Sequence, residues 1–216
     1  KRTEDYVKLV PLDPFYRLYF DDGRHFEYTG DQARMEAEVA KFNPADVEGY
    51  RRFMAGIKVI YDRAFADLAH EPFLKRADFI KILPELARLN ALRSVYTYVA
   101  SYLRDPHLRK VFSFHPLFIG GNPFRASAFY AIVPYLERQG GVLFPRGGTH
   151  ALVQAMARLF ERLGGEVRTG EPVVEIVVRD GCAAGVRTAV GAELPAELVV
   201  SNADPATTWR MLPGAP

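Results

Sequence analysis

The chain has 216 residues, of which 49% are hydrophobic and 25% charged, and 28 basic against 26 acidic side chains give a net charge of +2. This length and apolar content predict a sizeable core and parts of two domains, while the near-neutral charge argues against a nucleic-acid partner. The single cysteine, Cys182, cannot form an internal disulfide, which argues against a disulfide-stapled secreted fold and favours a reducing cytosolic setting.

The first predicted element is a β-hairpin. Aromatic runs at residues 15–20 and 25–28 flank a polar turn in which Gly23 supplies a positive φ. Asp31 is typical of a residue that caps a helix N-terminus, and it predicts a helix that reaches Phe42.

Further helices are predicted from proline positions and apolar spacing. Asn43 with Pro44 starts one helix, because proline at the first helical position loses no hydrogen bond. Its buried stripe would be Val47, Tyr50, Met54, Ile57 and Tyr61. Pro84 is expected to start another, and Asp105 with Pro106 the next. The apolar face of the Pro84 helix would be Leu89, Leu92, Tyr96, Val99 and Leu103. Residues 31–114 should therefore be largely helical.

Strands are predicted after about residue 165. Residues 173–178 form an apolar run, and Asp180 with Gly181 is typical of a hairpin turn that leads into a returning strand at 182–190. A short apolar run at 198–200 predicts a further strand that is buried on both faces.

A glycine turn precedes the strand region. Residues 144–148, Phe-Pro-Arg-Gly-Gly, combine a rigid proline with two glycines just before Thr149, whose hydroxyl could cap a helix ending at Gly164. Backbone without Cβ that points at a helix start lets a large anionic cofactor approach closely. On these residues alone, an ordinary turn into an amphipathic helix is the commoner interpretation.

Short motifs follow one another along nearly the whole chain. They are DPFYRL (13–18), DDG (21–23), YTGD (28–31), LRSVY (92–96), FSFHPL (112–117), GGNPF (120–124), FPRGGT (144–149), LGGEV (163–167) and SNAD (201–204). Each is weak alone. Their joint order and spacing closely resemble the bacterial and fungal phytoene desaturase family, the carotenoid-forming members of the FAD-dependent amine-oxidase-like flavoproteins.

The resemblance implies an α/β fold, present here as an α+β fragment. Residues 1–143 would form a mainly helical domain that binds substrate and membrane, with the β-hairpin near its start. Residues 144–216 would be part of a Rossmann-like FAD-binding domain. These flavoproteins open with a GxGxxG turn that holds the FAD pyrophosphate, and no GxGxxG occurs in this sequence. We therefore expect an internal fragment that is inactive and binds FAD weakly on its own.

The implied activity is that of an FAD-dependent oxidoreductase that desaturates phytoene towards lycopene in carotenoid biosynthesis. Implied partners are an apolar C40 carotenoid, a quinone or oxygen as electron acceptor, and a membrane surface, with the protein cytoplasmic and peripheral. No apolar run reaches the roughly 18–20 residues that a bilayer span needs. Two alternatives remain, a desaturase of another carotenoid polyene and a non-catalytic prenyl-binding escort protein on the same scaffold. The five histidines show no metal-binding spacing, so no metal site is expected.

The resemblance also suggests residues that contact the cofactor. Arg146, Gly147 and Gly148 would run beside the flavin. Val173 would meet the adenine edge of FAD through its backbone, which a strand can do whatever its side chain. A sheet strand that packs inward is the alternative for Val173.

Asp78 and Lys81 are the candidate catalytic residues, at i, i+3 spacing on one helical turn. The family carries an acidic and a basic residue in this segment that are suspected of acid/base work, although the basic one is more typically arginine. A carboxylate in an apolar tunnel would have a raised pKa, which suits proton transfer. A solvated ion pair is the alternative.

Candidate substrate-binding residues come from an aromatic-rich region between residues 96 and 130. A polyene offers no polar handle, so its site should be a long apolar channel lined largely by aromatic side chains. Phe118 and Phe124 are the aromatic candidates, and Arg125 would lie near the flavin or the channel mouth. Pairing of Arg125 with a carboxylate at a domain seam is equally open.

Overall fold

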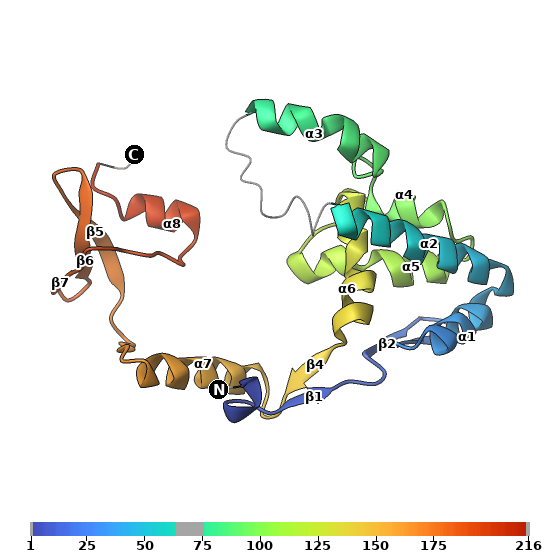
Figure 1. Ribbon diagram of the computed structural model, residues 1–216, viewed down its shortest axis with the longest axis horizontal. Coiled ribbons are helices and arrows are strands. Elements are labelled where there is room, and N and C mark those ends of the chain that lie inside the picture. Colours follow the sequence, from blue (N-terminus) through green and yellow to red (C-terminus); the bar gives the residue numbers. More distant parts are fainter. Residues whose placement is uncertain (1, 64–75, 215–216) are drawn as a thin grey trace. The chain divides into compact units, whose positions relative to one another are not determined.

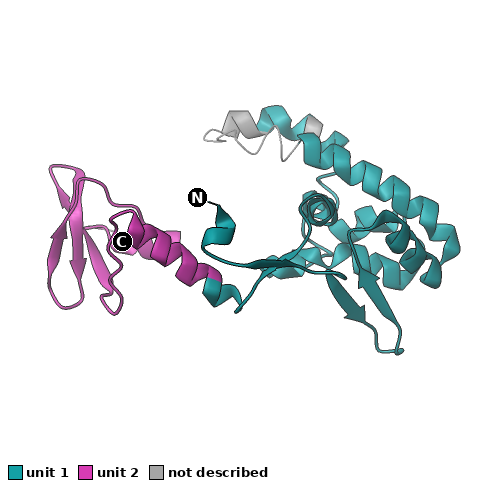
Figure 2. Cartoon of the chain, turned by 60° about the horizontal axis from the view of Figure 1, so that its bottom comes forward, with its two compact units in different colours: residues 1–151 teal, residues 152–216 magenta. Residues whose placement is uncertain are grey.

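The computed structural model describes residues 2–63 and 76–214, without the side chains of residues 76–79, 85 and 86. The chain divides into two compact units, Lys1–Ala151 and Leu152–Pro216 (Figure 2). Helices occur together with three small antiparallel sheets, which agrees with a mixed α and β class. The Rossmann-like character and the division into a substrate domain at 1–143 and an FAD domain at 144–216 remain predictions.

Unit 1 contains most of the helices (Figure 1). Its elements in chain order are η1 (Thr3–Asp5), β1 (Leu9–Pro11), β2 (Tyr16–Tyr19), β3 (His25–Tyr28), α1 (Gln32–Phe42), η2 (Pro44–Asp46), α2 (Val47–Ile60), α3 (Arg76–Arg88), α4 (Val95–Ala100), α5 (Pro106–Ser113), η4 (His115–Ile119), η5 (Ala128–Ile132), α6 (Val133–Gly140) and β4 (Leu143–Pro145). Helix α7 (Thr149–Arg162) begins in unit 1 and continues into unit 2.

The predicted hairpin and the first helix boundaries are confirmed. β2 and β3 pair antiparallel, with Leu18 opposite Phe26, and Gly23 has φ +83° in the turn. The Asp31 carboxylate accepts a hydrogen bond from the backbone N–H of Arg34 at 2.8 Å and so caps α1. Asp105 caps α5 in the same way, by accepting from the backbone N–H groups of the first helical turn.

The core of unit 1 forms where α2 packs against the other helices and the hairpin. Tyr50, Phe53 and Ile57 of α2 are fully buried, and the Tyr50 and Phe53 rings lie 5.3 and 5.6 Å from the ring of Phe112 on α5. The predicted α2 stripe is confirmed, because Val47 and Tyr61 pack against the same cluster as its buried members. This packing fixes α2 as the central helix of the unit.

Two residues near the start of α2 hold it close to the chain between α4 and α5. A Cβ built on Gly49 would lie 2.2 Å from the backbone oxygen of Tyr102, so only glycine allows this approach. The buried Asp46 carboxylate accepts hydrogen bonds from the backbone N–H groups of Arg104 and Asp105 at 2.8–2.9 Å. Together they fix the position of α5, which precedes the 117–124 segment.

The predicted helix starting at Pro84 is wrong. Pro84 lies inside α3, and a turn separates α3 from α4. Asn90 has φ +58° in this turn, and Ser94 caps α4 by accepting from the Thr97 N–H at 3.2 Å. Leu92, which was expected on the apolar face, is 69% exposed because it falls in the turn. Asparagine tolerates the left-handed conformation and so ends the helical run.

Unit 2 contains a three-stranded antiparallel sheet, β5 (Val173–Arg179), β6 (Cys182–Thr188) and β7 (Glu193–Pro195), followed by α8 (Pro205–Arg210). The predicted hairpin is confirmed, with φ +51° at Asp180 and +78° at Gly181. The predicted strand at 198–200 is wrong. Leu198 and Val200 are 78% and 83% exposed, and among the described residues this segment pairs with no strand. An apolar run becomes a strand only where a neighbouring edge supplies hydrogen bonds, and here the sheet ends at β7.

Two segments that are far apart in the sequence meet just before the glycine turn. β1 pairs antiparallel with β4, with Val10 opposite Phe144. The backbone N–H of Arg146 then donates to the oxygen of Lys8 at 2.8 Å. The start of the chain therefore fixes where the 146–148 turn begins.

Candidate functional site

The turn at Arg146, Gly147 and Gly148 has the open backbone that the sequence predicts. Gly147 and Gly148 have φ +92° and +84°, a region that favours glycine. A Cβ on Gly148 would meet no atom within 4 Å, and Arg146 and Gly147 are exposed. Thr149 is the first residue of α7, so Gly148 and not Thr149 precedes the helix.

This turn fits a large anionic cofactor. The backbone of Gly148 is open, whereas a Cβ on Gly147 would lie 3.2 Å from the Ala151 Cβ. Successive glycines with positive φ let a diphosphate or an isoalloxazine approach the backbone closely. The exposed Arg146 guanidinium supplies a cation at the same place. The described residues are therefore compatible with FAD at this turn.

Val173 lies in the other unit. It begins β5, is half-buried, and pairs with Thr188 of β6. These observations agree with the sheet-strand alternative, and the contact of its backbone with FAD stays a prediction. Arg146 to Gly148 belong to unit 1 and Val173 to unit 2.

Asp78 and Lys81 both lie in α3, so their i, i+3 spacing is helical as expected. Lys81 is exposed. The side chain of Asp78 lies outside the described residues. The catalytic roles of these two residues stay predictions.

Phe118, Phe124 and Arg125 are all exposed side chains of unit 1. Phe118 is on η4, where its ring contacts Phe114 edge-on at 5.3 Å. Phe124 and Arg125 follow in the next loop, and the Phe124 ring lies 4.6 Å from the ring of Tyr96. The roles of all three residues in substrate binding remain untested.

The 117–124 segment has several apolar side chains that are exposed to solvent. Leu117, Phe118, Ile119 and Phe124 are 59–64% exposed. We call these four residues the apolar loop. Among the described helices, none combines the length and apolar character that a bilayer span requires.

A buried polar cluster in unit 1 was not predicted. The Tyr16 hydroxyl donates to Glu137 Oε2 at 2.9 Å and lies 3.1 Å from His115 Nε2. The His115 side chain is fully buried. The three residues come from β2, η4 and α6 and are far apart in the sequence, so no spacing pattern could have revealed them. The only signal was a histidine within the FSFHPL motif.

The cluster fixes the histidine tautomer. Because the single hydroxyl proton of Tyr16 goes to Glu137, His115 Nε2 must carry a hydrogen to bond the Tyr16 oxygen. Nδ1 of His115 is buried and has no hydrogen-bond partner among the described residues, and the same is true of the Tyr28 hydroxyl and of Arg138 Nε. Burial, with the neighbouring Tyr28 and Glu137, raises the pKa of Tyr16 well above its usual value. Tyr16 is therefore a neutral hydrogen-bond donor here at physiological pH.

No metal site is seen in the described ranges, because no three His, Cys, Asp or Glu side chains within residues 2–63 and 76–214 lie close enough to share an ion.

Comparison with known proteins gives a family match over nearly the whole chain. A model of the flavin-containing amine oxidoreductases matches residues 2–212.

Several curated proteins are similar to the chain. A lycopene-forming phytoene desaturase of Pseudescherichia vulneris is 45% identical over 214 residues, which cover 99% of this chain and 44% of that protein. A neurosporene-forming phytoene desaturase of Rhodobacter capsulatus is 46% identical over 95% of this chain and 40% of its own length. A 4,4'-diapophytoene desaturase of a Methylomonas species is 31% identical over 94% of this chain. The chain thus spans less than half the length of these relatives.

Proposed function

Because the chain belongs to the flavin-containing amine oxidoreductase family, we propose that the complete protein is an FAD-dependent desaturase that converts phytoene towards lycopene. The observation that carries the proposal is the 45% identity, over 99% of the chain, to a lycopene-forming phytoene desaturase. The relatives named above are desaturases, which supports an enzyme over a prenyl-binding escort protein.

The cofactor proposal assigns Arg146, Gly147 and Gly148 to the flavin and the Val173 backbone to the adenine edge. Bound there, FAD would supply the hydride acceptor for a saturated carbon of the substrate, and a proton would leave the neighbouring carbon. The open backbone of the 146–148 turn supports this assignment. We infer that a quinone or oxygen then reoxidises the flavin.

The catalytic proposal assigns the proton transfer to Asp78, with Lys81 as its cationic neighbour. Helical i, i+3 spacing in α3 supports a shared face. Asp78→Asn should reduce turnover far more than it reduces the melting temperature. Unchanged turnover would remove Asp78 from the mechanism.

The substrate reaches the protein from a bilayer, because a C40 hydrocarbon is insoluble in water. The apolar loop supports peripheral membrane contact, since exposed apolar side chains that cluster on a surface are typical of lipid interaction sites. Arg125, directly after Phe124, supplies a cation that suits anionic headgroups. We propose that this loop enters the headgroup region of the cytoplasmic leaflet and that Phe118 and Phe124 meet the substrate there.

Flotation with liposomes tests the membrane proposal. The double variant Phe118→Ser with Phe124→Ser should lose most of its liposome binding, because it removes two exposed aromatic rings from the loop. Tyr19→Ser is a matched control, since Tyr19 is 74% exposed on β2 and lies outside the apolar loop. Equal flotation of the two variants would contradict the proposal.

Expression of the complete protein in cells that accumulate phytoene tests the activity. Lycopene or a shorter desaturation product should form and be recognised by its visible absorption. Phytoene that stays unchanged in the presence of FAD, membranes and a quinone would refute the proposed function.

A further inference from the structure

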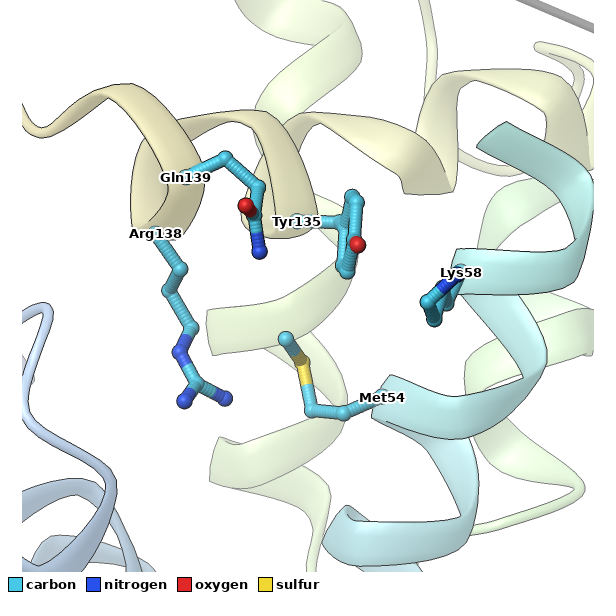
Figure 3. A pocket seen from close by; sticks show the side chains of 5 residues that line it. All are labelled: Met54, Lys58, Tyr135, Arg138 and Gln139. Carbon is cyan, nitrogen blue, oxygen red and sulfur yellow. The ribbon is translucent and has the colours of Figure 1, made fainter. Parts of the chain in front are cut away.

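A small pocket lies between α2 and α6 of unit 1. Met54 and Lys58 of α2 and Tyr135, Arg138 and Gln139 of α6 line it, and its volume is about 140 Å³ (Figure 3). A single water needs roughly 10–15 Å³ of such space, while drug-sized ligands occupy roughly 300–1,000 Å³. The pocket therefore suits a group of a few heavy atoms, and it is too small for a C40 chain or a dinucleotide.

The lining is rich in hydrogen-bond donors. Four of the five lining residues carry donor groups: the Arg138 guanidinium, the Lys58 ammonium, the Gln139 amide and the Tyr135 hydroxyl. Figure 3 shows Arg138 pointing from α6 towards α2, and Met54 pointing from α2 towards α6. A hydrocarbon in this pocket would offer these donors no acceptor, so the lining favours a group with several acceptor oxygens.

The charge of Arg138 is not neutralised by a bonded carboxylate. Among the described residues its guanidinium makes one hydrogen bond, from Nη1 to the Tyr50 hydroxyl at 3.3 Å, and its Nε is buried without a partner. Glu137, the neighbour of Arg138 on α6, is engaged by Tyr16. Glu36, whose pKa is lowered mainly by its hydrogen bond from Arg51 and to a smaller extent by Arg138, pairs with Arg51 at 2.6 Å.

Lys58 adds a second cation at the opposite wall. It pairs with Asp62, and this hydrogen bond raises the pKa of Lys58 and keeps the amine charged. Asp62 balances Lys58, whereas among the described residues no carboxylate pairs with the Arg138 guanidinium. An oxyanion in the pocket would supply that partner.

We propose that this α2–α6 pocket binds a phosphate-type oxyanion. Arginine offers a planar fork and lysine a compact charge, and both match the several oxygens of a phosphate group. The phosphate could be free or carried by a lipid headgroup, and the chemistry of recognition is the same. The proposal does not depend on the desaturase activity.

Isothermal titration calorimetry of the complete protein with inorganic phosphate tests the site. Arg138→Gln should weaken binding about ten- to a hundredfold, because a hydrogen bond to a charged group is worth about 1.5–3 kcal/mol. Lys58→Gln should weaken it several-fold. Lys58 is more than half exposed, so this variant decides the question even if Arg138→Gln fails to fold. Arg104→Gln and Lys110→Gln remove exposed cations elsewhere and are the matched controls.

Binding to vesicles distinguishes a lipid headgroup from free phosphate as the source of the bound group. Phosphatidylglycerol vesicles are compared with vesicles of a phosphate-free galactolipid, for the same variants. A preference for phosphatidylglycerol that both pocket variants lose assigns the site to a lipid headgroup, while an effect seen with inorganic phosphate alone assigns it to a free phosphate. Pocket variants that match the controls in both assays, or no phosphate binding tighter than ~10 mM with no vesicle preference, would overturn the proposal.

Discussion

Tyr16 and Tyr28 are stacked neighbours whose hydroxyl groups should contribute to stability with opposite sign. Their ring centroids lie 4.8 Å apart, and each can be replaced by phenylalanine with the loss of one oxygen. The Tyr16 hydroxyl donates to Glu137 and contacts His115, while the buried Tyr28 hydroxyl has no hydrogen-bond partner in the part of the chain that the structure describes. We predict that Tyr16→Phe destabilises unit 1 and that Tyr28→Phe leaves it unchanged or more stable.

The magnitude follows from what each change leaves behind. Tyr16→Phe removes the hydrogen-bond partner of the Glu137 carboxylate and of the buried His115 Nε2–H. An unsatisfied buried polar group costs about 1–3 kcal/mol. Tyr28→Phe removes a hydroxyl that has already lost its water without gaining a partner. For a unit of this size, 1 kcal/mol corresponds to about 2–4 °C in melting temperature.

Urea unfolding followed by tyrosine near-UV circular dichroism measures the effect in unit 1. Trp209, the single tryptophan, lies on α8 in unit 2, so its fluorescence is an internal control that should not change. Equal destabilisation by the two substitutions, or none by Tyr16→Phe, would refute the reasoning about the buried cluster.

Two further predictions concern close packing and alkaline pH. Gly49→Ala should destabilise the protein by about 1–3 kcal/mol through overpacking, because the new Cβ would lie 2.2 Å from the Tyr102 backbone oxygen. Gly56→Ala should destabilise it less, since the nearest neighbours of Gly56 are the movable hydroxyl ends of two tyrosines. Equal urea midpoints for the two variants would contradict this prediction. Burial raises the pKa of Tyr50 from 10.0 to about 12, so the folded state keeps a proton that the unfolded chain loses. The contribution of Tyr50 to the free energy of unfolding should be complete below pH 10 and should be lost between pH 10 and about 12. Tyr50→Phe should therefore lose less stability over this range than the unsubstituted protein. Parallel stability profiles of the two proteins against pH would be evidence against the prediction.

Local signals in the sequence predicted much of the fold. Capping residues such as Asp31 and Asp105, and the turn at Asp180 and Gly181, act through hydrogen bonds to backbone groups only a few residues away. Such interactions involve only neighbouring residues and can therefore be recognised in the sequence. The confirmed boundaries are therefore those with a local cause.

The two errors have different causes, one a missing strand partner and the other a local backbone conformation. The apolar run at 198–200 has the composition of a strand, but no neighbouring edge pairs with it among the described residues. The spacing from Leu89 to Leu103 looked continuous because hydrophobic periodicity does not register a left-handed Asn90. In both cases the apolar pattern alone did not determine the backbone conformation.

The candidate site was predictable only in part. The open glycine turn follows from Gly147 and Gly148 themselves. The Tyr16, His115 and Glu137 cluster, by contrast, arises when three distant segments pack together. A single sequence does not show which distant residues come into contact. The roles of Asp78, Lys81 and Val173 depend on a bound flavin and polyene, and they stay predictions.

The most direct test is an assay of the complete purified protein with FAD and phytoene in liposomes, with a quinone present as electron acceptor. We predict a yellow flavin-loaded protein that converts phytoene to coloured desaturation products, with lycopene among them. A protein that takes up no flavin and leaves phytoene colourless would contradict the proposal that this chain is part of a carotenoid desaturase.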